Sequence, residues 1–367
     1  IQITSLLSSQ RQAFQMHWGG GTPTYLNPDE IRKLGELIRK HFSLNDSVLE
    51  ASCEIDPREL TKDHIQALKE VGFNRLSMGV QDFNEQVQKA VNRVQPESIT
   101  RDAVQWGREL GFKSINLDLI YGLPFQTLKS FEETLDRIID VSPERLAIFN
   151  YAHVPWLKKH MNLIRAEDLP SPDQKLAILK MTIEKLSAAG YDYIGMDHFA
   201  KPTDDLAIAQ KNKTLSRNFQ GYSTMAGYDV YALGMSAISQ LQNVYAQNAK
   251  SLPEYYKAVS ANELPTQVGY RMTADDHLRK EVINTLMCHF ELDENSIERK
   301  FNISFETYFA SSLARLEEFK ADGFVKRHSG KILIEGMGRL LVRNIVMCFD
   351  AYLDEMITDR PLFSRTV

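Results

Sequence analysis

Three times before residue 200, a helical segment ends at a glycine, an aromatic residue follows, and a short apolar strand begins. Glycine at a helix end takes the left-handed conformation that stops the helix. Alternating helices and buried-looking strands predict a parallel sheet, and right-handed crossovers close or nearly close such a sheet into a barrel. We therefore expect an α/β fold with a partial, open parallel β/α barrel, and a flat doubly wound sheet is the alternative. The junctions are Gly72-Phe73, Gly111-Phe112 and Gly190-Tyr191, before strands expected at 75–80, 114–120 and 192–196.

The stretch from residue 15 to residue 26 predicts a short strand that runs into three consecutive glycines and a Thr-Pro pair. Asn27 and Pro28 then open a helix as its N-cap and its first-turn proline. Glycines allow a backbone to approach a ligand closely. The sequence matches neither the phosphate loop of nucleotide hydrolases nor the dinucleotide fingerprint. A tight connection without a ligand is the alternative interpretation.

Polar or glycine-rich residues follow most of the expected strands. In α/β barrels the carboxyl ends of the strands carry the functional site, so we expect a site at this edge. Helix capping and turn formation are the alternative roles for each single residue, above all for Asp56 and Asp82. The residues concerned are 19–22, Glu54, Asp56, Gln81, Asp82, Asp118, Asn150, Asp197 and His198.

The pattern changes near residue 243. Helices are expected at 252–261, 275–290, 304–319 and 338–352, and a hairpin at 321–334 turns around Ser329-Gly330. We therefore expect two domains, a partial barrel at 1–242 and a mainly helical, winged-helix-like domain with a small β wing at 243–367. The charge of the second domain is mixed rather than basic, so a lid over the barrel is favoured over DNA binding.

Composition narrows the class of protein. The 367 residues carry a net charge of −5 and no apolar run of membrane-spanning length, so neither a nucleic acid partner nor a membrane span is expected. Cys53, Cys288 and Cys348 are few and scattered, which favours a reducing cytoplasm over a disulfide framework. The chain begins with Ile1 rather than methionine, and we expect a segment upstream of it.

The stretch M-H-W-G-G-G-T-P-T-Y-L, residues 16–26, resembles the radical S-adenosylmethionine superfamily, and more closely its oxygen-independent coproporphyrinogen III oxidases. The resemblance implies a radical SAM barrel. It also implies that a reduced 4Fe-4S cluster splits S-adenosylmethionine and that two propionates of coproporphyrinogen III become vinyl groups in haem synthesis. Supporting stretches are C-E-I-D-P-R-E at 53–59, F-N-R-L-S-M-G-V-Q-D-F-N at 73–84, N-L-D-L-I-Y-G-L-P at 116–124, R-N-F-Q-G-Y at 217–222 and M-C-F-D at 347–350.

The resemblance also implies site residues for two S-adenosylmethionine molecules. The first would meet Gly20, Gly21, Thr22, Glu54, Ala152 and Ile238. The second would meet Gln81, Arg93 and Asp118, with a guanidinium placed to pair with a carboxylate. A surface ion pair for Arg93 and a plain core position for Ile238 are the alternatives.

One family feature is missing from the sequence. The family holds its cluster with Cys-x-x-x-Cys-x-x-Cys, and no such motif occurs here. We expect the first βα unit, with these cysteines, upstream of residue 1. We therefore expect no metal ligand within the 367 residues and no radical reaction from them alone. A natural relative that has lost its cluster is the alternative.

Other functions stay open at this point. A haem chaperone of the same superfamily and a nucleic acid regulator are the competing classes, and R-N-F-Q-G-Y favours the oxidases. The resemblance leaves the catalytic residues, the reductant and the electron acceptor unidentified. Arg217 and Arg365 are hypothetical anchors for the substrate carboxylates.

Overall fold

The computed structural model describes residues 2–7 and 11–353, which form two compact units. We call residues 7, 11–193 and 197–204 the sheet unit. Residues 2–6, 194–196 and 205–353 are the C-terminal unit. The domain border expected between residues 242 and 243 stays a prediction, because the two compact units do not by themselves define functional domains.

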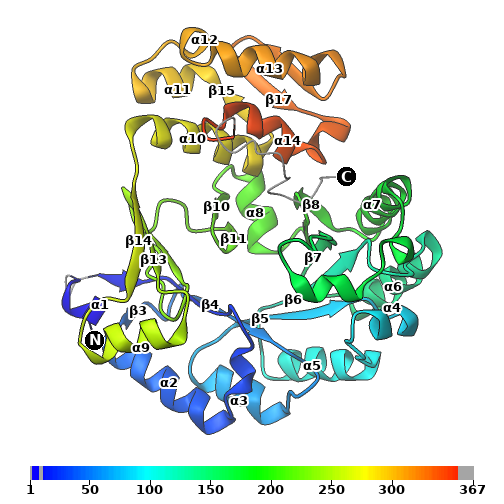
Figure 1. Cartoon of the computed structure of the whole chain (residues 1–367), viewed down its shortest axis with the longest axis vertical. Coiled ribbons are helices and arrows are strands. Elements are labelled where there is room, and N and C mark those ends of the chain that lie inside the picture. The colour runs from blue at the N-terminus through cyan, green and yellow to red at the C-terminus, as the bar shows by residue number, and fades with distance from the viewer. Residues whose placement is uncertain (1, 8–10, 354–367) are drawn as a thin grey trace. The chain divides into compact units, whose positions relative to one another are not determined.

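A seven-stranded sheet organises the sheet unit (Figure 1). Its first five strands are parallel to one another, as expected from the alternating pattern. Among the described residues, β2 and β8 form its two edges, so the sheet is open. In spatial order the strands are β2 (Gln15–Trp18), β4 (Glu50–Ile55), β5 (Arg75–Gln81), β6 (Ser114–Tyr121), β7 (Arg145–Asn150), β9 (His198–Ala200) and β8 (Asp192–Gly195).

The sixth position of the sheet corrects one expectation. His198 was expected to follow the last strand as a polar strand end, but it begins β9, which runs antiparallel to β7. The chain reverses at Met196, whose φ is 52°, and the Ile148 amide donates to the Asp197 carbonyl at 2.7 Å. The reversal inserts β9 between β7 and β8.

Six helices follow the convex outer side of the curved sheet (Figure 1). The expected N-cap at Asn27 is confirmed. Its side chain accepts a hydrogen bond from the Glu30 backbone amide at 3.0 Å, and the Glu30 carboxylate accepts one from the Asn27 backbone amide at 2.9 Å. Ser171 caps a later helix in the same way. The helices are α2 (Pro28–His41), α3 (Lys62–Glu70), α4 (Glu85–Ala90), α5 (Glu97–Glu109), α6 (Leu128–Val141) and α7 (Pro172–Ala188).

Short elements complete this unit. They are the pair β1 (Gln12–Ala13) and β3 (Ser43–Leu44), and the 3-10 turns η1 (Pro23–Tyr25), η2 (Lys159–Leu163) and η3 (Ala166–Asp168).

Side chains alternate across the sheet, since successive residues of a strand point to opposite faces. On β4, Cys53 and Ile55 are buried in the apolar core, as are Leu76, Met78 and Leu117 on the next two strands. This core lies between the sheet and its outer helices. The opposite, inner face of the same strands is polar.

At the amino ends of the strands, the inner face carries a network of opposite charges, which we call the ionic floor. Asp204, whose side chain is 3% exposed, accepts from Arg145 at 2.8 Å and from the Ser114 hydroxyl at 3.1 Å. Arg75 lies 3.5 Å from Glu50 and 3.9 Å from Asp204. Each buried charge therefore has an opposite charge within reach.

The C-terminal unit contains more strand than the sequence indicates. The region expected to be mainly helical also holds β13 (Val244–Asn248) and β14 (Thr266–Arg271), which form an antiparallel sheet with β12 (Ile238–Gln240) from just before that region. The other elements up to residue 289 are α1 (Gln2–Ser5), α8 (Asp205–Lys211), β10 (Ser216–Asn218), β11 (Gly221–Ser223), α9 (Leu252–Ser260) and α10 (Ala274–His289).

The expected wing is present, and its hairpin turns at Ser329 and Gly330, as the sequence predicts. It belongs to a three-stranded sheet in the order β15, β17 and β16, in which three helices follow β15. The elements are β15 (Glu291–Asp293), α11 (Glu294–Phe301), α12 (Phe305–Tyr308), α13 (Ala310–Ala321), β16 (Val325–His328) and β17 (Lys331–Ile334).

Two helix expectations were wrong in their extent. The helix expected at 304–319 breaks at Phe309, which packs between Phe305 and Phe349. The closing helix expected at 338–352 is three short turns, η4 (Gly336–Arg339), α14 (Val342–Val346) and η5 (Met347–Phe349). Arg315 and Arg279 donate to the carbonyls of Cys348 and Phe349 at 2.6 and 2.9 Å, which ends the helical path there.

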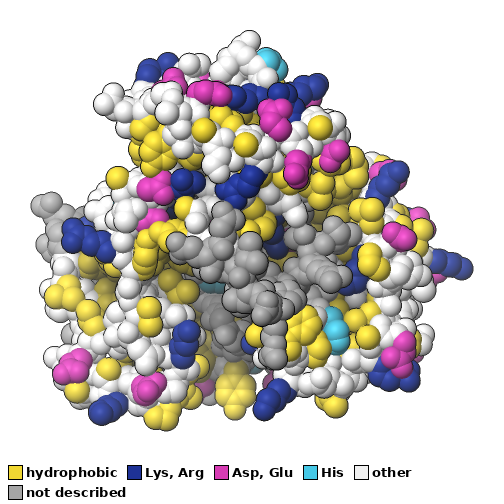
Figure 2. Space-filling view, turned by 45° about the horizontal axis from the view of Figure 1, so that its top comes forward, with side chains coloured by type: hydrophobic (Ala, Val, Ile, Leu, Met, Phe, Trp, Pro, Cys, Tyr) yellow, Lys and Arg dark blue, Asp and Glu magenta, His cyan; other side chains and the backbone are white. Residues whose placement is uncertain are grey.

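The surface is mixed in charge. On the face in Figure 2, the Lys and Arg side chains of the described residues lie among Asp and Glu side chains without a continuous basic patch. In the described part of the chain, no helix combines the length and the apolar character that crossing a membrane requires.

Candidate functional site

The carboxyl half of the inner face carries a second polar group of residues, which we call the inner row: His17, Ser52, Glu54, Ser77, Asn116 and Asp118. Strand register brings them together. Glu54 pairs with Ser77 across β4 and β5, and Ser77 pairs with Asn116 across β5 and β6. His17 lies beside Ser52 on the neighbouring pair of strands. The row therefore crosses four strands on one face.

Asp118 lies at the far end of the inner row. Its Oδ1 accepts from the Asn116 amide at 2.7 Å, and the same amide donates to the Ser77 hydroxyl at 3.0 Å. Burial raises the pKa of Asp118 to about 6, and the negative charge of Glu54 adds to the rise. Among the described residues, no cation forms an ion pair with this carboxylate. Its charge would be stabilised by a cationic or hydrogen-bond-donating ligand, and its assignment to a cofactor stays a prediction.

Glu54 shows the opposite electrostatics. Its Oε1 lies 3.5 Å from His17 Nε2, and its Oε2 accepts from the Gly20 amide at 3.3 Å. These contacts, that with His17 first, lower the pKa of Glu54 although burial opposes them. His17 is held in turn by Ser52, whose hydroxyl lies 2.7 Å from Nδ1. Glu54 is thus an oriented carboxylate.

The glycine loop explains why these carboxylate contacts exist. A Cβ at Gly19 would lie 2.6 Å from His17 Nε2 and 2.7 Å from Glu54 Cδ, so only glycine leaves room there. Gly20 has a φ of 84°, which favours glycine. A Cβ at Gly20 or Gly21 would meet nothing within 4 Å, so this backbone faces open space. The loop therefore presents bare backbone beside Glu54, and the exposed Thr22 follows it.

Gln81 and Arg93 meet at a bulge at the end of β5. Gln81 has a φ of 67°, and its side chain lies over Gly79, where a Cβ would come 2.5 Å from its Nε2. Arg93 donates to the Gly79 carbonyl at 3.0 Å and lies 3.6 Å from Asp56. Gln81 Oε1 and Arg93 Nε are buried without a hydrogen-bond partner.

Arg93 forms an ion pair with Asp56, as the alternative interpretation expects, but it is more buried than a surface residue. Its side chain is 22% exposed, and burial lowers its pKa. Asp56 is bound more closely by Arg58, whose Nη2 lies 2.6 Å from Oδ2. Arg93 Nε and Gln81 Oε1 have no hydrogen-bond partner. A polar ligand bound here could donate to the oxygen and accept from the nitrogen, so that both buried atoms would be satisfied.

Two expected positions are not members of the inner row. Ala152 is half-buried in the segment after β7. Ile238 begins β12 in the C-terminal unit and pairs with Gln247. The contacts within the sheet unit join neither residue to the row, and their assignment to a cofactor stays a prediction.

Asp82 has a structural role, as the alternative of capping or turn formation expects. It is 1% exposed and accepts from Thr134 and Gln126 at 2.6 Å each, and from the Asn84 amide at 2.8 Å. The contacts with Thr134 and Gln126 hold the end of β5 to α6 and to the loop after β6, and the contact with Asn84 fixes the turn after β5. This carboxylate stabilises the fold.

Sequence reasoning missed four members of the inner row: His17, Ser52, Ser77 and Asn116. A signal was present in the strand parity, since Ser52 lies two residues before Glu54 and Asn116 lies two residues before Asp118. Same-face positions on neighbouring parallel strands lie side by side once the register is known.

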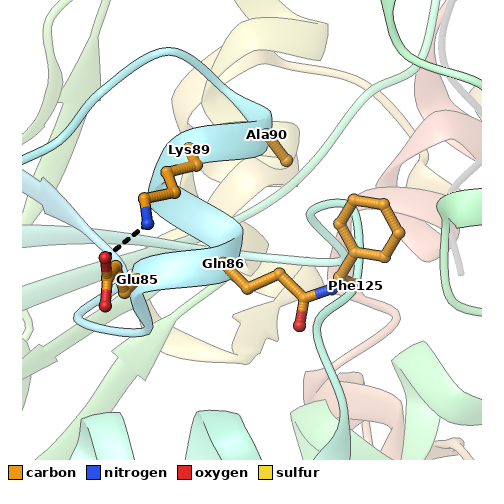
Figure 3. Close-up of a pocket in the computed structure, with 5 residues that line it drawn as sticks. All are labelled: Glu85, Gln86, Lys89, Ala90 and Phe125. Atoms are coloured by element: carbon orange, nitrogen blue, oxygen red, sulfur yellow. Dashed lines mark ion pairs between the residues drawn. The ribbon is translucent and has the colours of Figure 1, made fainter.

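A second cavity lies elsewhere on the sheet unit (Figure 3). It measures about 500 Å³ and is lined by Glu85, Gln86, Lys89, Ala90 and Phe125. Figure 3 shows the Phe125 ring opposite Ala90, and the Glu85–Lys89 ion pair along α4. Because its charged groups already pair with each other, this cavity lacks convergent free polar groups, and the inner row is the better candidate.

Metal ligands do not gather in the described residues. No group of three or more His, Cys, Asp and Glu side chains is arranged for a metal within them. Cys53, Cys288 and Cys348 are buried and free, and burial raises the pKa of each thiol. Arg365, a hypothetical substrate anchor, lies outside the described residues.

Comparison with known proteins gives matches at both ends of the chain. The sequence profile of the radical SAM superfamily matches residues 6–138, and that of the HemN C-terminal domain matches residues 272–341. The oxygen-independent coproporphyrinogen III oxidase of Salmonella typhimurium is 48% identical over 367 residues, which cover 100% of this chain and 80% of that protein. The protein of the same name from Pseudomonas aeruginosa is also 48% identical, over 369 residues and 80% of its length.

A solved structure matches the fold. The coproporphyrinogen III oxidase (HemN) from Escherichia coli, described as a radical SAM enzyme, aligns with a TM-score of 0.91 at 48% identity. The alignment covers 94% of this chain and 79% of that one. The expected α/β fold with a mostly parallel open sheet is confirmed.

Proposed function

The chain belongs to the family of oxygen-independent coproporphyrinogen III oxidases, and on that premise we propose that the complete protein oxidises coproporphyrinogen III in cytoplasmic haem synthesis. Two propionates would each lose a hydrogen atom, carbon dioxide and one electron, leaving vinyl groups and giving protoporphyrinogen IX. A reductant and an electron acceptor, both unidentified, would complete the balance. The observation that carries the proposal is the 48% identity along the whole chain.

The inner row fits S-adenosylmethionine by its chemistry. That cofactor carries an ammonium, a sulfonium and ribose hydroxyls, and carboxylates are the side chains that such groups prefer. Glu54 is oriented, and Asp118 has no cationic partner in the described chain. The bare backbone at Gly20 and Gly21 and the orphaned atoms of Gln81 and Arg93 add hydrogen-bonding capacity.

We assign the expected residues to two cofactor molecules on this basis. Gly20, Gly21, Thr22, Glu54, Ala152 and Ile238 would serve one molecule. Gln81, Arg93 and Asp118 would serve the other. Glu54 contacts His17 and Gly20, whereas Gln81 and Arg93 lie together at Gly79, and these different sets of contacts support two molecules rather than one. Titration of the binding stoichiometry by calorimetry tests the number.

The cluster does not fit the cysteines of this chain. Each thiol is buried, and no two of them lie in a shared group of metal ligands within the described residues. When bound, S-adenosylmethionine and a reduced cluster supply the 5′-deoxyadenosyl radical that takes the substrate hydrogen. Glu54 and the backbone of the glycine loop would orient the cofactor, and the apolar core on the other side of the sheet excludes water from behind the inner face.

The test compares two forms of the protein. The product of the complete coding sequence and the 367-residue form are reconstituted anaerobically with iron and sulfide, and 5′-deoxyadenosine is measured with coproporphyrinogen III present. We expect formation by the complete product alone, together with protoporphyrinogen IX. Absence of both products from the complete, cluster-loaded protein contradicts the oxidase proposal. Haem binding by that same protein would then favour the chaperone.

A further inference from the structure

The C-terminal unit contains a small cavity of about 190 Å³ that the proposed function has not used. We call it the Arg217 pocket. Four segments build it: the turn after β8, strand β10, helix α10, and α14 with η5. Its lining is Met196, Arg217, Ile283, Met287, Arg343, Val346, Met347 and Asp350. The pocket is thus apolar along its walls and carries two guanidinium groups and one carboxylate.

Arg217 is fixed in this pocket. Its guanidinium carbon lies 5.7 Å from the centroid of the Tyr222 ring on the neighbouring strand. The Tyr222 hydroxyl donates to the Met287 carbonyl at 3.1 Å, which ties that ring to α10. A Cβ at Gly195 would lie 2.6 Å from the same hydroxyl, so glycine is needed for this approach.

The charge of Arg217 is incompletely satisfied. Its Nε is buried without a hydrogen-bond partner. A buried guanidinium donor without an acceptor costs free energy that a carboxylate would recover, because a fork of two N–H groups matches its two oxygens. Arg217 therefore favours an anionic ligand over an apolar one.

The opposite wall is rigid as well. Ile283 and Met287 lie one turn apart on α10, so they face the same side. Asp350 accepts from the Tyr352 amide at 2.8 Å, and Arg279 and Arg315 hold the two carbonyls just before it. Arg343 lies exposed at the rim. The pocket therefore has a preformed shape with a positive charge on each side.

The geometry points to a subsite for a single carboxylate on a short apolar arm, which under the proposed function is one propionate of the tetracarboxylate substrate. A volume near 190 Å³ is below the ~300–1,000 Å³ of pockets that enclose whole drug-sized ligands. It accepts a side arm and not a tetrapyrrole ring. The Met, Ile and Val walls contact the two methylene groups, and Arg217 pairs with the carboxylate. This inference rests on the proposed function for the identity of the arm.

The first experiment measures binding without turnover. Coproporphyrin III, the stable oxidised form of the ring, and its tetramethyl ester are titrated against the complete protein by fluorescence. We expect Arg217→Gln to weaken binding of the acid about 10- to 100-fold, the range for a charge-assisted hydrogen bond. Arg217→Lys should fall between, since it keeps the charge without the fork. Binding of the ester should not change.

Three further variants test whether the loss of binding comes from the Arg217 guanidinium itself. Arg299→Gln removes a guanidinium from an exposed position of α11 in the same unit, and it should bind both ligands as the unaltered protein does. Arg343→Gln changes only the rim and should weaken acid binding a few-fold, so it keeps the test open if Arg217→Gln fails to fold. Added methylguanidine should restore acid binding to Arg217→Ala.

The outcomes separate the two proposals. An equal loss of acid and ester binding in Arg217→Gln, or no loss at all, overturns the carboxylate subsite, while oxidase activity of the unaltered protein leaves the proposed function standing. An acid-specific loss without any oxidase activity keeps the subsite for a porphyrin propionate and removes the oxidase. Weaker S-adenosylmethionine binding in Arg217→Gln would assign the carboxylate to that cofactor and overturn the substrate subsite.

Discussion

Two levels of the same inner face treat their charges differently. In the ionic floor, Arg75 and Arg145 meet Glu50 and Asp204, with N–O distances from 2.8 to 3.9 Å. In the inner row, four residues further along β4 and β6, Glu54 and Asp118 carry the same sign. Both levels use strands β4, β5 and β6 and the same face, so the difference there comes from the choice of side chains.

The comparison separates a structural use of charge from a functional one. Buried charges stabilise a fold only when each has an opposite partner and further hydrogen bonds. The floor meets the first part of that condition, since each of its charges has an opposite partner within 3.9 Å, although Arg145 Nη2 is buried without a hydrogen bond. The row does not, since the charged form of Asp118 is disfavoured by burial and by Glu54. A cationic ligand would remove that cost, which is the physical reason for placing the cofactor there.

The largest effect should come from breaking the floor. Asp204→Ala leaves Arg145 and Arg75 without their shared carboxylate in a buried position, and we expect a loss of about 3–5 kcal/mol in the free energy of unfolding. Urea unfolding measures it. The control is Asp46→Ala, which removes an exposed ion pair with Arg39 and should cost less than about 1 kcal/mol. Equal losses in the two variants would contradict the floor's role.

The next effect concerns ligand binding in the row. Glu54→Gln keeps the size of the side chain and removes its charge, so S-adenosylmethionine affinity should fall about 10- to 100-fold. Because the lowered pKa of Glu54 shows that its charged form is favoured in the folded state, stability at pH 7 should also fall, by less than about 1 kcal/mol for this partly exposed side chain. Equilibrium binding to the complete protein measures it. Glu36→Gln, an exposed position on α2, is the control and should bind normally. Unchanged affinity in Glu54→Gln would remove this carboxylate from the cofactor site.

Asp118 should make the free energy of unfolding depend on pH. Its pKa is raised to about 6 from an ordinary 3.8, so the folded state holds the proton more tightly than the unfolded state. The stability contributed by the neutral form is present at low pH and is lost as pH rises through about 6. Asp118→Asn should remove that decline and raise stability at pH 7 on the order of 1 kcal/mol, while weakening cofactor binding.

Urea unfolding of the ligand-free protein between pH 4 and pH 7.5 provides the measurement. A parallel pH dependence in Asp118→Asn and the unaltered protein would show that another group causes the decline. Glu54 should act in the opposite direction, because its pKa is lowered and its contribution is lost as pH falls.

The smallest effect tests the support of Glu54. Ser52→Ala removes the hydroxyl 2.7 Å from His17 Nδ1, and we expect a loss of about 1 kcal/mol in stability and a few-fold loss in cofactor affinity. Ser47→Ala removes an exposed hydroxyl contact with Asn45 and should change neither quantity. Full cofactor affinity in Ser52→Ala would show that His17 needs no such support.

Much of the sheet unit could be predicted from the sequence. The glycine-aromatic junctions, the capped helix after Asn27 and the apolar strands are local signals, and the structure has the expected elements at each. The antiparallel β9 and the sheet of β12, β13 and β14 were missed, because their short strands have no local periodicity. They exist through pairing with distant partners such as Ala147 and Tyr270.

The sequence by itself determined the family, through ordered motifs along the chain, and the edge of the sheet at which polar residues gather. Only the tertiary structure decided which of those residues work together. In the structure Asp82 accepts a hydrogen bond from Thr134 and so stabilises the fold. His17 on β2 lies 3.5 Å from Glu54 on the neighbouring strand β4. The reason is physical: a strand's parity is local, but its register with its neighbours is set by the packing of the whole sheet.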